Sequence, residues 1–186
     1  MKQYNIEKFE TYQNRLSYIE SEWKIIKEEC LRVPVQKFKV YHTMIDVVED
    51  DIGWLAYPLY YKFRLLDFDR YAPKTTKILS NMDVVNAAFS LFVPGTETTL
   101  HSGSTPYTYR SHLGLDVPED CEFEIESNNF TAHEGEITLF PSELPHKAWN
   151  KSDRNRFILL LDFLKPDYEK ENIFKTTSKR NITIHD

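Results

Sequence analysis

The chain has 186 residues, of which 41% are hydrophobic and 14% aromatic, and it contains only 5 glycines. This length and composition fit one domain with a real core and exclude a disordered or low-complexity protein. The formal net charge is −6 and the sequence has no dense Lys/Arg run, so we expect no nucleic-acid partner. No apolar run approaches the roughly 20 residues that cross a bilayer, and the charged start lacks a signal peptide's apolar centre. We therefore expect a cytoplasmic protein that does not bind a membrane.

The first part of the chain predicts helices. Between Ile6 and Ile26, apolar side chains recur at alternating steps of three and four, at Phe9, Tyr12, Leu16, Ile19 and Trp23. This spacing is typical of an amphipathic helix, and we expect its aromatic stripe to pack against a sheet. Pro34 ends that helix. A second, shorter helix is expected over residues 73–82, because Pro73 suits a first turn.

From Val84 onward the pattern predicts strands, at residues 87–93, 97–101, 105–115, 121–127, 136–141 and 156–163. Turn sequences such as PG, SG, PED and HEG separate them, which favours an antiparallel sandwich or jelly roll. The predicted fold is mainly β with α, with the N-terminal helices packed on one sheet. We expect a single domain over 1–186, with a mostly helical lead-in (1–83), a jelly-roll core (84–166) and a loosely held polar tail (167–186).

Two cysteines occur, Cys30 in a helical pattern and Cys121 in a strand pattern. Their spacing does not suit a metal site. We interpret both as reduced thiols.

Two histidines stand in strand-like segments, His112 in YRSHLGLDVP (109–118) and His146 in LPHKAWN (144–150). Non-haem iron(II) oxygenases usually hold the metal by two histidines and one carboxylate, which commonly lies two residues after the first histidine. Here that position is Gly114. The residues alone leave two interpretations: a two-histidine centre with water or another ligand in the third place, or two core histidines and a glycine at a bulge or close backbone approach.

Arg156 begins the apolar segment RFILLLDF, ten residues after His146. A charged side chain that faces a core is costly unless it is paired, and a guanidinium matches a carboxylate bidentately. Arg156 is therefore either an anion-binding residue or half of a surface ion pair at a strand end.

Several segments together resemble the aspartyl/asparaginyl β-hydroxylases, a family of iron(II)- and 2-oxoglutarate-dependent oxygenases. They are PGTETTLHSG (94–103), RSHLGLDVP (110–118), EGEITLF (134–140), HKAWN (146–150) and LLLDFLKP (159–166), with upstream similarity in IESEWKIIKEE (19–29), GWLAYPLY (53–60) and APKTTKIL (72–79). The resemblance runs from Ile19 to Pro166 and implies a double-stranded β-helix, cupin-like, that uses Fe(II), 2-oxoglutarate and O₂. In that family a glycine likewise follows the first metal histidine by two residues.

The resemblance implies His112 and His146 as the only protein ligands of iron. It also implies that Arg156 holds the distal carboxylate of 2-oxoglutarate. Arg110 is a second candidate for a carboxylate contact, with a structural salt bridge as the alternative.

The LHSGST segment is implied to lie beside the cosubstrate. Ser102 and Ser104 are expected to add hydroxyl contacts to its carboxylate. His101 is expected either to bind substrate or to cap its turn.

Trp149 is implied to wall the pocket and Trp54 to lie near the substrate opening, with plain packing as the alternative for both. Glu124 and Glu126 occupy places where the family usually carries a basic residue near the cosubstrate. Unless they point away, this suggests a substrate with an ammonium or guanidinium group. Asp116 shares the parity of His112, but about 13 Å of strand separates them, too far for it to be the missing ligand.

The resemblance therefore implies a hydroxylase of an unactivated carbon, expected to be the β-carbon of an aspartyl/asparaginyl-type or other amino acid, free or carrier-bound. Oxidative decarboxylation of 2-oxoglutarate to succinate and CO₂ would accompany the hydroxylation. Three alternatives stay open: a halogenase with halide in the place left by Gly114, a non-catalytic jelly-roll binding module, and a metal-dependent isomerase or hydrolase, which usually needs three or four protein ligands. The sequence does not indicate an oligomeric state.

Overall fold

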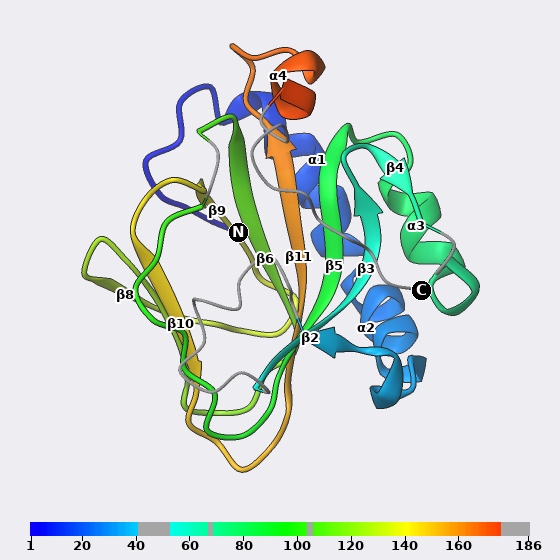
Figure 1. The fold of residues 1–186 in the computed structure, drawn as a ribbon, viewed down its shortest axis with the longest axis vertical. Helices are drawn as coiled ribbons and strands as arrows, with labels where there is room; N and C mark the ends of the chain where they lie inside the picture. Colours follow the sequence, from blue (N-terminus) through cyan, green and yellow to red (C-terminus); the bar gives the residue numbers. More distant parts are fainter. Residues whose placement is uncertain (41–52, 67–68, 104–105, 176–186) are drawn as a thin grey trace.

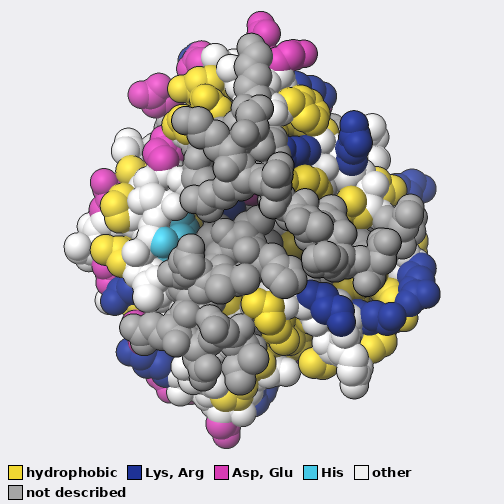
Figure 2. Space-filling model, in the orientation of Figure 1, with side chains coloured by type: hydrophobic (Ala, Val, Ile, Leu, Met, Phe, Trp, Pro, Cys, Tyr) yellow, Lys and Arg dark blue, Asp and Glu magenta, His cyan; other side chains and the backbone are white. Residues whose placement is uncertain are grey.

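The computed structural model describes residues 1–40, 53–66, 69–103 and 106–175. Figure 1 shows helices α1, α2 and α3 together on one side of a large twisted sheet, with β8 and β10 on the other side. The expected packing of the N-terminal helices on one sheet is confirmed. In Figure 2, the basic side chains on the described part of this face lie mostly on the right, and the acidic ones lie mostly at the left and the top.

The larger sheet has eight strands in the order β1-β9-β6-β11-β5-β3-β2, and β4 pairs with β3. A parallel pair, β1 with β9, forms one edge, and the other pairs are antiparallel. The strands are β1 (Lys2–Gln3), β2 (Lys39–Val40), β3 (Trp54–Tyr61), β4 (Arg64–Leu65), β5 (Val84–Phe92), β6 (Thr108–Asp116), β9 (Ile137–Pro141) and β11 (Arg156–Leu164).

The smaller sheet has the order β10-β7-β8 and comprises β7 (Cys121–Ile125), β8 (Asn128–Thr131) and β10 (His146–Asn150). Segment 97–101 extends it beyond β10 through two isolated bridges, Glu97 to Trp149 and His101 to His146. From β5 onward the chain therefore passes repeatedly between the two sheets: β5, β6, β9 and β11 belong to the larger, and segment 97–101, β7, β8 and β10 to the smaller. This alternation is a double-stranded β-helix, so the predicted fold class is confirmed.

The strand β11 shows how the sequence supports both sides of the larger sheet. Between Phe157 and Leu161 its residues are apolar on both faces, as expected for a strand buried on both sides. Leu159 and Leu161 join the core under the helices, whereas Ile158 and Leu160 join the core between the two sheets. Because successive strand residues point to opposite faces, one continuous apolar run supplies two cores.

The helices are α1 (Glu10–Ser21), α2 (Trp23–Arg32), α3 (Pro73–Leu79) and α4 (Lys170–Lys175). The helix expected over 6–26 begins later, is interrupted at Glu22 and then continues to Arg32, just before Pro34. Its aromatic stripe packs on the sheet as expected, where the Tyr12 hydroxyl donates a hydrogen bond to the Leu164 carbonyl (2.6 Å).

A buried carboxylate ties α2 to α3. Glu29 is 1% exposed and accepts hydrogen bonds from the backbone amides of Lys74 (2.9 Å) and Thr75 (2.7 Å) and from the Thr75 hydroxyl (2.8 Å). These amides belong to the first turn of α3, whose N–H groups have no partner within the helix. Glu29 therefore fixes α3 against α2.

The lead-in is less helical than predicted, because β3 lies within it and pairs with β5. The strand expected at 97–101 is reduced to two bridges, and β6 begins at Thr108. The tail contains α4, and its residues 176–186 lie outside the described part of the chain. None of the described helices is long and apolar enough to cross a membrane. Cys30 and Cys121 are free and buried.

Candidate functional site

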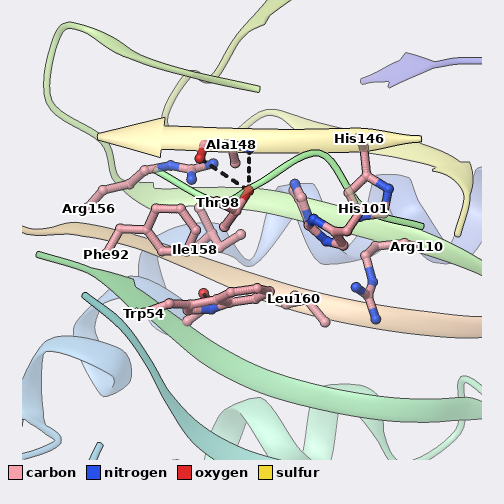
Figure 3. A pocket seen from close by; sticks show the side chains of 12 residues that line it. Trp54, Phe92, Thr98, His101, Arg110, His146, Ala148, Arg156, Ile158 and Leu160 are labelled. Carbon is pink, nitrogen blue, oxygen red and sulfur yellow. Dashed lines mark hydrogen bonds between the residues drawn. The ribbon is translucent and has the colours of Figure 1, made fainter. Parts of the chain in front are cut away.

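One small cavity lies between the two sheets and brings together several polar side chains of the core (Figure 3). It has about 20 Å³ of space, enough for a water-sized group. Side chains from β3, β5, segment 97–101, β6, β10 and β11 surround it. The lining residues are Trp54, Ser90, Phe92, Thr98, His101, Arg110, His112, His146, Ala148, Arg156, Ile158 and Leu160. Three histidines and two arginines thus face one space, and no carboxylate is among the residues that line it.

His101 and His146 are neighbours in this cavity, with ring centroids 4.3 Å apart. The Nδ1 of His101 lies 2.8 Å from the Thr99 carbonyl, and the Nδ1 of His146 lies 2.7 Å from the Leu144 carbonyl. Because a carbonyl oxygen only accepts, each Nδ1 carries the proton and each Nε2 keeps its lone pair. The His101 Nε2 is buried without a hydrogen-bond partner. A metal-binding histidine typically donates a hydrogen bond from its other ring N–H, often to a backbone carbonyl as here.

His112 lines the same cavity from β6, but its ring packs against the rings of Phe123 and Phe140, at 5.5 and 5.3 Å between centroids. Its Nδ1 is buried without a partner. The structure thus brings all three histidines to one site, and the ring beside His146 is that of His101. The sequence carried a signal for this arrangement, because Gly103 follows His101 by two residues just as Gly114 follows His112.

Both glycines stand where the backbone leaves no room for a side chain. A Cβ at Gly103 would lie 2.6 Å from the Ser142 carbonyl oxygen, and one at Gly114 would lie 2.1 Å from the His133 carbonyl oxygen. Close backbone approach therefore explains the missing carboxylate at either position. Within the described ranges, no group of three or more His, Cys, Asp or Glu side chains is placed to hold a metal ion.

The surroundings keep the histidines neutral. Burial, with smaller contributions from nearby cationic side chains, lowers the pKa of His101 and His112, and lowers that of His146 to about 3. A neutral imidazole is the form that binds a metal ion.

Arg156 is 2% exposed, and its guanidinium lies over the Phe92 ring, 5.2 Å from the centroid. Burial lowers its pKa to about 10, so it remains a cation at neutral pH. Its Nε and Nη2 atoms are buried without hydrogen-bond partners. The alternative of a surface ion pair is wrong. A buried, unsatisfied guanidinium facing a cavity is instead suited to bind an anion.

Arg110 also lines the cavity, but a carboxylate already holds it. Its Nε and Nη2 donate to the two oxygens of Asp162 at 2.9 and 3.1 Å, and Asn86 Nδ2 donates to Asp162 as well, at 3.0 Å. The structural salt bridge that the sequence left open is therefore present, and both partners are buried.

Trp54, which was expected near the substrate opening, lines the cavity, and its Nε1 donates to the Ser90 hydroxyl at 2.9 Å. The sequence reasoning missed Ser90. Its signal was a single hydroxyl in the otherwise apolar second half of VVNAAFSLF. With Trp54 as its donor, the Ser90 hydroxyl is oriented beside the cavity.

Trp149 is a correction, because it does not line the cavity. On β10, His146 and Ala148 face inward, so Trp149 faces outward. There Lys147 and Lys151 lie over its ring, at 5.5 and 5.1 Å from the centroid. Packing on the outer face is the role that the structure gives it.

Glu124 and Glu126 are corrected for the same reason. Phe123 and Ile125 are buried in the core between the sheets, so Glu124 points away and lies 3.6 Å from Lys147. Glu126 follows the end of β7, is exposed and accepts a hydrogen bond from Tyr4 (3.1 Å). The suggestion that these carboxylates select a cationic substrate has no support in this arrangement.

Of the two serines expected beside the cosubstrate, Ser102 is exposed and outside the cavity lining. Ser104 lies outside the described residues.

Comparison with known proteins places this site in context. The chain matches the family described as Aspartyl/Asparaginyl beta-hydroxylase over residues 20–166. It is 29% identical over 164 residues to ornithine lipid ester-linked acyl 2-hydroxylase of Rhizobium tropici, covering 80% of this chain and 56% of that protein. It is 25% identical to mouse aspartyl/asparaginyl beta-hydroxylase, covering 84% of this chain and 22% of that protein. The chain thus spans about half, or less, of the length of these relatives.

Solved structures with a similar chain course include the Cupin_2 domain of an XRE family transcriptional regulator from Enterobacter cloacae, with a TM-score of 0.42 and 14% identity over 60% of this chain and 96% of that one. Ectoine synthase from P. lautus also has a TM-score of 0.42 and 14% identity, over 75% of this chain and 84% of that one.

Proposed function

The chain belongs to the aspartyl/asparaginyl β-hydroxylase family, and on this premise we propose that it is a hydroxylase that depends on iron(II) and 2-oxoglutarate. One observation carries the proposal: two neutral histidines with adjacent rings and an unsatisfied buried arginine face the same cavity. The histidines suit a divalent transition metal, and the arginine suits the carboxylate of an organic acid.

We assign the metal to His101 and His146. The sequence favoured His112 as the first ligand. The adjacency of the other two rings, and their shared pattern of Nδ1 held by a carbonyl, support His101 instead. His112 remains in the cavity, where its buried and unpartnered Nδ1 suits a hydrogen bond with a cosubstrate.

Arg156 is assigned to a carboxylate of 2-oxoglutarate, because its Nε and Nη2 form the fork that bidentate carboxylate binding requires. Ser90 supplies a nearby hydroxyl, while Arg110, held by Asp162, contributes little net charge. The cavity of about 20 Å³ is smaller than 2-oxoglutarate. Binding therefore requires some of the lining side chains to move.

When bound, iron(II) and 2-oxoglutarate would supply the electrons that activate O₂ for hydroxylation of an unactivated carbon. The protein positions and shields these groups. Trp54, Phe92, Ile158 and Leu160 form apolar walls that limit water around the reacting groups. With only two protein ligands, coordination positions stay available for cosubstrate and O₂.

The proposed substrate is an aspartyl/asparaginyl-type or other amino acid, free or carrier-bound, and the proposed site of hydroxylation is its β-carbon. A lipid-linked acyl chain is the second class, favoured by the similarity to the ornithine lipid hydroxylase. The cytoplasmic location stays a prediction.

The decisive experiment reconstitutes the protein anaerobically with iron(II) and 2-oxoglutarate and records the visible metal-to-ligand charge-transfer band. O₂ is then admitted, and succinate is measured against a panel of free amino acids, peptides and acyl lipids. The proposal expects a band that is lost in His101→Ala and His146→Ala, and succinate that rises with one panel member. The product of that reaction is analysed by mass with and without bromide, which separates hydroxylation from halogenation.

Neither a band nor succinate from the folded wild-type protein would overturn the proposal and favour a non-catalytic binding module. A band without stimulated turnover would support the cofactor assignment and exclude the substrates tested.

A further inference from the structure

Segment 97–101 contains one residue more than its partner strand. Glu97 bridges to Trp149 and His101 bridges to His146, so four steps along the segment match three steps along β10. The backbone hydrogen bonds show the same one-residue offset: Thr98 N donates to the Ala148 carbonyl (2.9 Å), and His101 N, three residues later, donates to the His146 carbonyl (3.0 Å), two residues earlier on β10. The extra residue is a β-bulge.

The bulge decides which side chain faces His146. In an unbroken antiparallel register, Leu100 would be paired with His146 and His101 would fall on the opposite face, because side chains alternate along a strand. The extra residue reverses this parity after Thr98. His101 consequently points into the cavity, and Leu100 is 60% exposed.

The side chain of Thr98 completes the hydrogen bonding at the bulge. In a regular pair, the Ala148 amide would donate to a backbone carbonyl of the partner strand. Here it donates to the Thr98 hydroxyl oxygen at 2.9 Å (Figure 3). Thr98 is 2% exposed, and its hydroxyl therefore satisfies a backbone donor inside the protein.

The Thr99 carbonyl, the next one along the bulge, orients the ring of His101. Thr99 O accepts the Nδ1 proton of His101 at 2.8 Å, which fixes the tautomer and leaves Nε2 toward the cavity. The two parts of the bulge act together: the Thr98 side chain takes the ladder bond, and the Thr99 carbonyl orients the ring.

We propose that Thr98 is a positioning residue of the metal site: its hydroxyl holds the bulge, and the bulge holds the His101 ring beside that of His146. Thr98 acts through the backbone of Ala148 and through His101. The inference rests on the proposed function, since it takes His101 as a metal ligand.

The test compares Thr98→Val, which keeps the shape and loses the hydroxyl, with Thr98→Ser, which keeps the hydroxyl. The matched control is Thr76→Val. Thr76 is another buried threonine, and its hydroxyl bonds to the Ala72 carbonyl (3.0 Å) in α3, away from the cavity. Co²⁺ serves as the probe, in anaerobic titrations of the metal-free proteins by calorimetry and visible absorption, with the thermal midpoint of each variant measured alongside.

We expect Thr98→Val to weaken Co²⁺ binding by about tenfold or more, the usual effect of removing support from a metal ligand. Thr98→Ser and Thr76→Val should bind within about threefold of wild type. Wild-type affinity in Thr98→Val, or equal weakening in Thr98→Ser, would overturn the proposal.

A second measurement needs no variant. Hydrogen exchange of the Ala148 amide in the wild-type protein should be slow, and exchange at the rate of an unprotected amide would overturn the proposal even if Thr98→Val does not fold. A wild-type protein that takes up no Co²⁺ would overturn the two-histidine metal site and the positioning role together. Co²⁺ binding that is equal in wild type and Thr98→Val would overturn the positioning role alone.

Discussion

His101 and His146 are paired twice: their rings lie 4.3 Å apart, and their backbones exchange both hydrogen bonds of one antiparallel pair, at 2.8 and 3.0 Å. A hydrogen-bonded pair of this kind places two side chains on the same face of a sheet at close range. The distance between the rings is thus set by the ladder as well as by side-chain packing. A metal ion held by them would be anchored to the smaller sheet.

This pairing makes a prediction that separates the two possible ligand sets. His101→Ala and His146→Ala should each abolish measurable Co²⁺ binding, whereas His112→Ala should keep affinity within about tenfold of wild type and weaken 2-oxoglutarate binding instead. Calorimetric titration of each metal-free variant checks this. Full Co²⁺ affinity in His101→Ala, with loss in His112→Ala, would restore the ligand pair suggested by the sequence.

Arg156 is expected to lower the stability of the metal-free protein while it binds 2-oxoglutarate. Arg156→Met removes a buried cation that lacks a partner, so the free energy of unfolding of the metal-free protein should rise by about 1 kcal/mol. The same variant should lose 2-oxoglutarate binding. Arg156→Lys keeps the charge without the fork and should raise the KM for 2-oxoglutarate by roughly tenfold or more. Urea denaturation and succinate assays measure the two effects, and a destabilised Arg156→Met protein would contradict the assignment.

The buried ion pair between Arg110 and Asp162 should contribute more to the free energy of unfolding than an exposed ion pair does. Asp162→Asn leaves the Arg110 cation without its counter-charge and should lower the free energy of unfolding by about 3 kcal/mol. Asp167 forms an exposed ion pair with Lys8, so Asp167→Asn is the matched control and should cost less than about 1 kcal/mol. Equal effects on the chemical denaturation midpoints of the two variants would show that burial does not control this pair.

The pH dependence of stability should follow the cavity histidines. Burial lowers their pKa in the folded protein, that of His146 to about 3, whereas a histidine of the unfolded chain titrates near 6.5. Between these values the unfolded chain binds more protons. The stability of the metal-free protein is therefore fully present above about pH 6.5 and falls as the pH drops toward 3. Denaturation at pH 7.5, 6 and 5 tests this, and His146→Phe should show a shallower fall.

Much of the fold was predictable, because short, mostly apolar runs bounded by turn sequences mark β5, β6, β9 and β11, and alternating apolar and polar residues mark β7. The strand β3 was missed. Pro58 interrupts its pattern, and the pairing with β5 shifts register between Pro58 and Tyr60. Such an irregularity depends on the neighbouring strand, which local sequence does not contain.

The sequence indicated most residues of the site, but it did not show which way each side chain points. His112, His146, Arg110, Arg156 and Trp54, all named from the sequence, line one cavity, and their functional roles stay predictions. His101 was not predicted as a metal ligand, because a β-bulge sets the direction of its side chain. A bulge can be recognised only when the pairing of both strands is known. The outward direction of Glu124 was, by contrast, available from the apolar residues on either side of it, Phe123 and Ile125.

One edge of the larger sheet depends on a very short strand. Lys2 and Gln3 pair in parallel with Thr138 and Leu139 of β9, a strand whose five residues are all buried. Without β1, the outer side of β9 would present unsatisfied amides and carbonyls to solvent beside an apolar surface, which is the template on which strands of other molecules assemble. By covering this edge, Lys2 and Gln3 are expected to reduce aggregation. A purification tag that displaced them would promote aggregation.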